Sequence, residues 1–147
     1  MTVIAVKDGV MAADGFVWSG GIGSPVPFPK IVRGPNGLLG LSGPSVDCRM
    51  VRGWFANGER ESQKPKGIGE DDRGIVGLIL RPDGSVWYLD WRLFPVPDNE
   101  LAVMGESDAA TFVEGAMRAG ASAEEAVRLA VYYCQSAGGI VQVECWK

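Results

Sequence analysis

The chain has 147 residues, of which 46% are hydrophobic and 22% are charged, a composition typical of a globular protein. This length supports one hydrophobic core, so we predict a single domain over residues 1–147. The net charge of −4 and the scattered Lys and Arg residues argue against a nucleic-acid partner. Histidine is absent, which excludes Ser-His and Cys-His catalytic pairs and histidine-ligated metal sites.

The cysteines and the hydropathy of the chain indicate a cytoplasmic protein. Cys48, Cys134 and Cys145 are odd in number and widely spaced, which is typical of reduced thiols. Cys48 stands near the start of a predicted helix, where a thiol pKa can be lowered, but no base accompanies it. No apolar run reaches the roughly 18 residues of a membrane span, and no signal peptide is recognisable. We therefore expect no membrane association, no cofactor and no metal.

Three pairs of apolar, β-prone runs are each joined by a short turn, which predicts three antiparallel hairpins. The hairpins span residues 2–13 around Asp8-Gly9, 30–41 around Pro35-Asn36, and 75–91 around Pro82-Asp83. Both runs of the first hairpin are rich in Val, Ile and Ala. Both faces of these two strands are therefore expected to be buried.

The remaining segments outside the helices are two strands and two loops. Residues 101–104 form a short apolar strand, and residues 140–146 form a strand of alternating character. Residues 16–30 are rich in Gly and Pro and are predicted to form an irregular loop. Residues 59–73 are polar and charged, which predicts a mobile surface loop.

Three helices are predicted from apolar residues at helical spacing, over residues 44–57, 107–120 and 122–134. Pro44 suits the first position of the first helix, and Ser122 with Glu125 forms a capping box at the start of the third. The apolar residues expected to form the buried stripes are Val46, Met50, Val51, Trp54 and Phe55; Ala109, Phe112, Val113, Ala116 and Met117; and Ala126, Val127, Leu129, Ala130, Val131 and Cys134.

Thr2 stands at the start of the first predicted strand. If Met1 is removed, Thr2 carries both a hydroxyl group and a free α-amine. The intrinsic pKa of such an amine is roughly 7.7–8.0, so a useful fraction is neutral base at physiological pH. A hydroxyl beside its own base is a recognised way to activate a nucleophile, which makes Thr2 the candidate nucleophile.

Several segments resemble the N-terminal-nucleophile hydrolases, specifically the proteasome β-subunit and its bacterial relative HslV. The resemblance covers most of the chain and is strongest at its two ends. Besides the helix pair, the segments that carry it are Thr2–Asp14, Lys30–Arg33, Ser42–Asp47, Val103–Gly105 and Ser136–Val143. The fold that it implies is of the α+β class, a four-layer α-β-β-α sandwich of antiparallel sheets.

The resemblance also implies roles for four residues. Thr2 would attack a peptide carbonyl, and its own α-amine would take up the hydroxyl proton. Lys30 would lie close to Thr2, where its positive charge would lower the pKa of the amine. Asp14 would balance and orient Lys30. The backbone N–H of Gly43, at a helix N-terminus, would stabilise the oxyanion.

The two supporting positions of the resemblance depart from its pattern. The family has a Ser directly after the glycine that corresponds to Gly105, whereas this chain has Glu106 there and Ser107 one residue later. Aligning the Ser of the final loop on Ser136 places Tyr133 where the family has an Asp. Ser107 and Ser136 are therefore the candidate supporting residues.

The resemblance implies a threonine peptidase that acts on peptides or unfolded proteins as a homo-oligomer. Residues 59–73 stand where relatives have a second long helix that contributes to ring and ATPase contacts, so no partner ATPase is expected. Glu106, Tyr133 and the short chain favour an alternative, a catalytically silent assembly protein, for example in a virus particle. A further alternative is an amidohydrolase of the same superfamily that acts on a small amide.

Overall fold

The fold was taken from a computed structural model of the chain. The structure describes residues 2–19, 22–24, 28–66, 68, 74–90, 94–95, 101–105 and 107–147. Glu106 and the acidic cluster at residues 70–72 lie outside the described residues, as does Met1.

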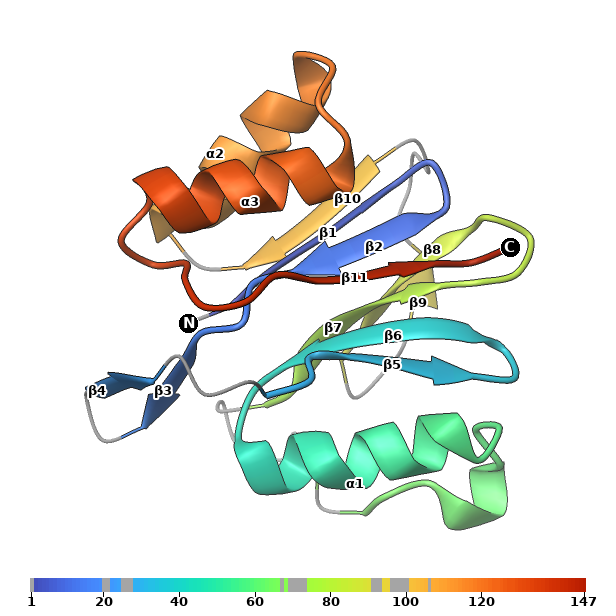
Figure 1. The fold of residues 1–147 in the computed structure, drawn as a ribbon. Coiled ribbons are helices and arrows are strands. Elements are labelled where there is room, and N and C mark those ends of the chain that lie inside the picture. The colour runs from blue at the N-terminus through green and yellow to red at the C-terminus, as the bar shows by residue number, and fades with distance from the viewer. Residues whose placement is uncertain are drawn as a thin grey trace.

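Two antiparallel sheets form the centre of the molecule (Figure 1). The first has the strand order β10-β1-β2-β11, with bounds Leu101–Gly105, Val3–Lys7, Val10–Ala13 and Gln142–Cys145. The second has the order β5-β6-β7-β8-β9, with bounds Ile31–Gly34, Gly37–Ser42, Val76–Leu80, Val86–Leu89 and Phe94–Pro95. All pairings in both sheets are antiparallel, as the hairpins predicted.

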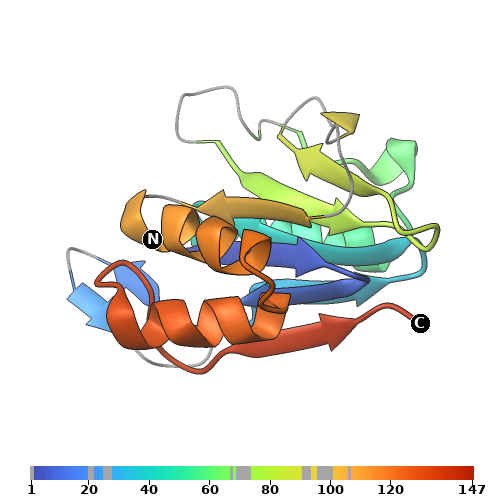
Figure 2. The same cartoon turned by 90° about the horizontal axis from the view of Figure 1, so that it is seen from above.

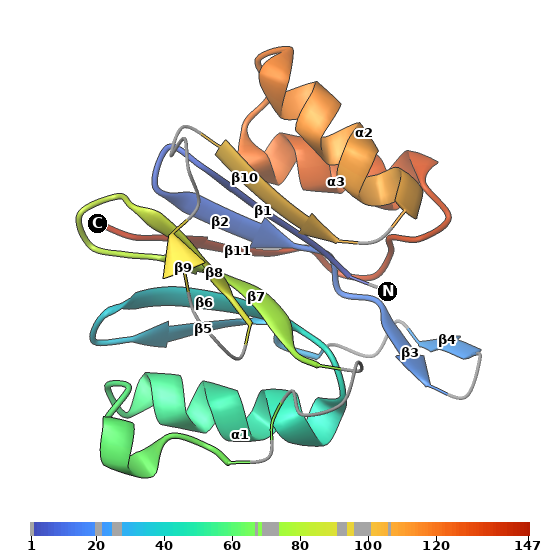
Figure 3. The same cartoon turned by 180° about the vertical axis from the view of Figure 1, so that it is seen from behind.

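Helices cover the outer face of each sheet. α2 (Ser107–Arg118) and α3 (Ala123–Tyr133) lie side by side over the first sheet, and α1 (Ser45–Ala56) lies under the second (Figures 1 and 2). The same order of layers is seen from behind in Figure 3. The predicted four-layer α-β-β-α sandwich is therefore confirmed. No helix in the described part of the chain is long and apolar enough to cross a membrane.

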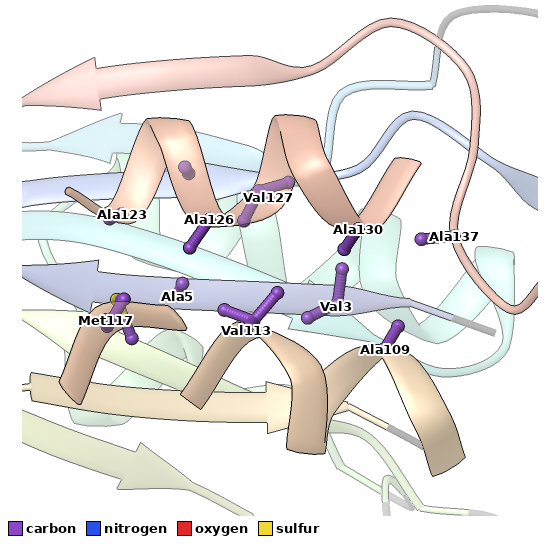
Figure 4. Packing of buried hydrophobic residues seen from close by; sticks show 11 residues of the cluster. Val3, Ala5, Ala109, Val113, Met117, Ala123, Ala126, Val127, Ala130 and Ala137 are labelled. Carbon is purple, nitrogen blue, oxygen red and sulfur yellow. The ribbon is translucent and has the colours of Figure 1, made fainter. Parts of the chain in front are cut away.

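Each pair of adjacent layers encloses its own hydrophobic cluster. Val3 and Ala5 of β1 face α2 and α3, where they pack against Val113 and Val127 (Figure 4). Ile4, the residue between them, points the other way into the cluster between the two sheets. This alternation explains why Val3 to Val6 are all apolar, since both faces of this part of the strand are buried.

Local turn chemistry fixes the first hairpin. Asp8 and Gly9 both have positive φ, 51° and 74°, which is the backbone conformation of a type I′ turn. The capping box at the start of α3 is also present, because Ser122 and Glu125 each bond the other's backbone N–H.

The prediction for residues 16–30 was wrong in part. A small hairpin forms there from β3 (Val17–Ser19) and β4 (Ile22–Ser24), which pair only with each other. Strands of three residues are too short to show an alternating pattern in a sequence rich in Gly and Pro. The loop predicted at 59–73 contains a short 3₁₀ helix, Glu61–Gln63, in its described part.

Four residues expected on buried helix faces are exposed. The exposed fractions are 69% for Val46, 46% for Met50, 36% for Phe112 and 42% for Leu129. In α1 the predicted Val51 and Phe55 are buried, together with Cys48, and they form a narrower stripe than the sequence pattern indicated.

Candidate active site

Asp14 is the centre of a buried polar cluster at the end of β2. One carboxylate oxygen, Oδ1, lies 2.7 Å from Nζ of Lys30 and accepts the backbone N–H of Val3 at 2.9 Å. The other, Oδ2, accepts the backbone N–H groups of Phe16 and Gly138, each at 3.3 Å. Asp14 is fully buried and Lys30 is only 5% exposed, so the ion pair is shielded from water.

Backbone contacts of Gly15 hold the loop after α3 close to Asp14. The N–H of Gly15 donates to the carbonyl of Gly138 at 2.8 Å. A Cβ on Gly15 would lie 2.3 Å from the carbonyl oxygen of Ile140, and a Cβ on Gly138 would lie 2.3 Å from the ring of Phe16. Only glycine fits at either position, so these two residues permit the close approach.

Lys30 is held in place by its backbone as well as by Asp14. Gln142 of β11 reaches across from the first sheet, and its Oε1 accepts the N–H groups of Lys30 and Ile31 at 2.9 and 3.0 Å. Its Nε2 donates to the carbonyl of Ile31 at 2.8 Å. The carbonyl of Lys30 accepts the N–H of Leu41 at 3.0 Å. The hydrogen bonds of Gln142 therefore link the edges of the two sheets beside the ion pair. This role of Gln142 was not predicted from the sequence.

The shared oxygen of Asp14 places the lysine beside Thr2. Oδ1 bonds both Nζ of Lys30 and the nitrogen of the Thr2–Val3 peptide bond. Burial lowers the pKa of Lys30, while the charge and hydrogen bond of Asp14 act in the opposite direction. A positively charged group is thus fixed next to the start of β1.

Thr2 is half-buried and leads into β1. β10 runs beside it, with Gly105 opposite Val3. A Cβ on Gly105 would lie 2.6 Å from the carbonyl oxygen of Thr2, so only glycine permits this approach. The end of β10, the start of β1 and the ion pair consequently meet at one end of the first sheet.

Ser136 is buried and linked to the start of α2. Its hydroxyl donates to Oδ1 of Asp108 and accepts the backbone N–H of Ala109 at 3.2 Å. Oδ2 of Asp108 accepts the N–H of Gln135 at 3.2 Å. Tyr133 points into solvent, with an exposed fraction of 68%. The carboxylate beside Ser136 therefore comes from α2 and not from α3.

The other two candidates, Ser107 and Gly43, stand at helix N-termini. Ser107 is the first residue of α2. Gly43 lies between β6 and α1 with a φ of +144°, and a Cβ there would lie 3.1 Å from Cα of Ile75. Gly43 follows Leu41, whose N–H bonds the carbonyl of Lys30, so β6 connects the ion pair to the start of α1. Backbone N–H groups at a helix N-terminus favour a developing negative charge.

No metal site accompanies this cluster in the described part of the chain. No three Cys, Asp or Glu side chains among those residues gather closely enough to hold an ion. The polar groups described at the cluster include the buried ion pair, the hydroxyl groups of Thr2 and Ser136, the carboxylate of Asp108, and backbone N–H groups.

The comparisons with known proteins place the chain in a structural class. No family model matches its sequence, and no curated protein matches it. Two solved structures cover nearly its whole length, each with a TM-score of 0.66. One is Thiobacillus denitrificans BPH in complex with Epoxomicin, 19% identical, covering 99% of this chain and 98% of that one. The other is eukaryotic HslV from Trypanosoma brucei, 17% identical, covering 98% of both chains.

These likenesses confirm at the level of the fold the resemblance predicted from the sequence. The chain has the fold of the N-terminal-nucleophile hydrolases. Within that class, its fold is similar to that of HslV over essentially the whole of both chains.

The three cysteines differ in how far their thiols are buried, so their reactivity tests the structure. Burial raises the pKa of the Cys48 thiol, and the charge of Asp47 adds to this effect while that of Arg52 opposes it. At Cys48 burial therefore outweighs the lowering of a thiol pKa that a helix N-terminus can produce. With iodoacetamide at neutral pH, exposed Cys145 should be alkylated first and buried Cys48 last. Peptide mass spectrometry over time measures the order, and equal rates at Cys48 and Cys145 would contradict it.

Proposed function

We propose that the chain is a threonine peptidase whose nucleophile is Thr2 after removal of Met1. The observation that carries the proposal is the buried Asp14–Lys30 ion pair, since the same Asp14 oxygen also bonds the nitrogen of the Thr2–Val3 peptide bond. A pair of this kind fixes a positive charge beside the chain start, where a free amine would need its pKa lowered.

In the proposed reaction, the hydroxyl oxygen of Thr2 attacks a peptide carbonyl while the α-amine of Thr2 takes up the hydroxyl proton. The charge of Lys30 favours the neutral amine before this step. The backbone N–H of Gly43, at the start of α1, stabilises the oxyanion of the tetrahedral intermediate. The protonated amine then gives its proton to the leaving nitrogen. Water, activated by the same amine, hydrolyses the resulting ester and regenerates Thr2.

We further infer that Asp108 and Ser136 help to orient the amine. Their hydrogen bond joins α2 to the loop whose Gly138 bonds Asp14. The carboxylate of Asp108 thereby supplies the acidic partner for Ser136 that is absent at Tyr133.

The proposal includes self-association in the cytoplasm, with peptides or unfolded proteins as substrates. Supporting it, the outer surface of α2 and α3 carries three exposed aromatic rings. Phe112 and Tyr133 lie 6.3 Å apart between ring centroids, and Tyr132 and Tyr133 lie 4.9 Å apart. Clustered exposed aromatic side chains are typical of protein interfaces.

Two forms of the protein that differ only at the chain start test the proposal. One form is released from a cleavable fusion so that Thr2 is its first residue, and the matched control keeps Met1. We expect the first form to hydrolyse fluorogenic peptides and the control to be inactive, because only the first has a free amine on Thr2. Folded protein of the first form that cleaves no peptide would indicate the silent assembly protein instead. Cleavage restricted to small acyl amides would indicate the amidohydrolase.

A further inference from the structure

A cavity of about 400 Å³ lies between Phe28 and the first turns of α1. It is lined by Phe28, Ser45, Val46, Arg49 and Arg52. Phe28 precedes Lys30 by two residues, and Ser45 follows Gly43 by two residues. The cavity therefore lies between the segment that carries the buried lysine and the helix start that carries the proposed oxyanion donor.

Two guanidinium groups give this cavity a positive character. The side chain of Arg52 lies over the ring of Phe28, with 4.6 Å between the guanidinium carbon and the ring centroid, and it donates to the carbonyl of Pro29. These contacts hold the group in place without neutralising its charge. Burial lowers the pKa of Arg52, and the like charge of nearby Arg49 lowers it further. Among the residues that the structure describes, no carboxylate forms an ion pair with either arginine.

The cavity also has an apolar wall. Val46 is 69% exposed although its position in α1 follows the apolar pattern. Val46 and the ring of Phe28 both line the cavity, where they offer contact to the methylene groups of a bound side chain. A volume of about 400 Å³ is ample for one amino-acid side chain. Apolar walls with a preplaced guanidinium suit a short aliphatic chain that ends in a carboxylate.

We propose that this cavity binds the acidic side chain of the substrate residue that donates the scissile carbonyl. The inference rests on the proposed function, because it assumes that Thr2 attacks a peptide held beside the cavity. Glutamate is preferred over glutamine, which has the same shape without the charge. Arg49 and Arg52 are the specificity-determining residues, with Arg52 held in place by Phe28 and Pro29.

Four fluorogenic peptides that differ only in the residue before the reporter group test this preference. With Glu, Gln, Leu and Lys at that position, we expect kcat/KM for Glu to exceed that for Gln by about ten- to hundredfold. Arg49→Gln together with Arg52→Gln should bring the Glu to Gln ratio of kcat/KM close to one, whatever its effect on the absolute rates. Arg128→Gln is the matched control, since Arg128 is exposed on α3 and pairs with Glu124. An unchanged ratio in the double variant would overturn the proposal.

A carboxylate also occurs at the C-terminus of a cleaved product. Inhibition by a peptide that ends in glutamine, compared as free acid and as amide, separates the two sources. If the free acid inhibits strongly and the Glu substrate shows no preference, the acidic side chain is not the ligand.

A binding measurement keeps the inference independent of turnover. Calorimetric titration of the Thr2→Ala variant with the uncleaved Glu and Gln peptides should show tighter binding of Glu. Loss of Arg49 and Arg52 should remove the difference. Tight, Arg-dependent binding of the Glu peptide without hydrolysis by the parent protein would refute the peptidase and leave the acidic pocket standing. Hydrolysis without a Glu preference would support the peptidase and refute the acidic pocket.

Discussion

Thr2→Ala is expected to abolish peptide hydrolysis in a chain whose Met1 has been removed, lowering kcat/KM by at least about a thousandfold. The substitution removes only the attacking oxygen and leaves the α-amine, Lys30 and Asp14 in place. Thr2 is half-buried at the chain start and its side chain belongs to none of the hydrophobic clusters. The thermal unfolding midpoint should therefore change little. Steady-state hydrolysis of fluorogenic peptides measures the loss.

Thr2→Ser is the matched control, because it keeps both a hydroxyl group and a free amine. We expect this variant to retain measurable hydrolysis. Activity of Thr2→Ala comparable to that of the parent chain would show that another group performs the reaction.

The second large effect concerns stability. Asp14→Ala should reduce the free energy of unfolding by about 3–5 kcal/mol, because it leaves a buried ammonium group without its partner. It also removes the acceptor for the backbone N–H groups of Val3, Phe16 and Gly138. Lys30→Met should cost less, since the remaining carboxylate keeps those three donors. Urea unfolding of both variants measures the difference.

An exposed ion pair and the pH dependence of stability provide two further tests of the buried Asp14–Lys30 pair. Glu114→Ala removes an exposed ion pair with Arg118 and should change stability by no more than about 1 kcal/mol. Because burial lowers the pKa of Lys30 from its ordinary value of 10.5, the unfolded chain binds more protons between the two pKa values. The contribution of Lys30 should therefore make the folded state more stable as pH rises through that window. An Asp14→Ala variant as stable as Glu114→Ala would contradict the buried pair.

The sequence predicted the features that depend on local chemistry. The turn at Asp8-Gly9, the capping box at Ser122 and the apolar run from Val3 to Val6 each carry their own signal over a few residues. Those signals determine where a hairpin turns, where a helix begins and which strand is buried between two layers. The pairing of Asp14 with Lys30 was implied by family resemblance, and the structure brings these two side chains together.

The features that the sequence did not predict depend on contacts between distant segments. Gln142 bonds the backbone of Lys30 across more than a hundred residues, and Asp108 of α2 bonds Ser136 in the loop after α3. Polar residues at strand and helix ends have many possible partners, so their spacing alone does not select one. The exposure of Val46 likewise depends on distant contacts, because it is set by which turns of α1 pack against the second sheet.

Thr2 is tested most directly as the nucleophile by intact-mass analysis after treatment with a peptide epoxyketone. The ketone carbon of this reagent accepts a hydroxyl group and its epoxide accepts an amine, so a stable ring requires both groups on one residue. For the chain that begins at Thr2, we expect a single adduct with the full mass of the reagent, mapped to Thr2 and absent from the form that retains Met1. Folded protein that gains no adduct, or one mapped to a cysteine, would contradict it.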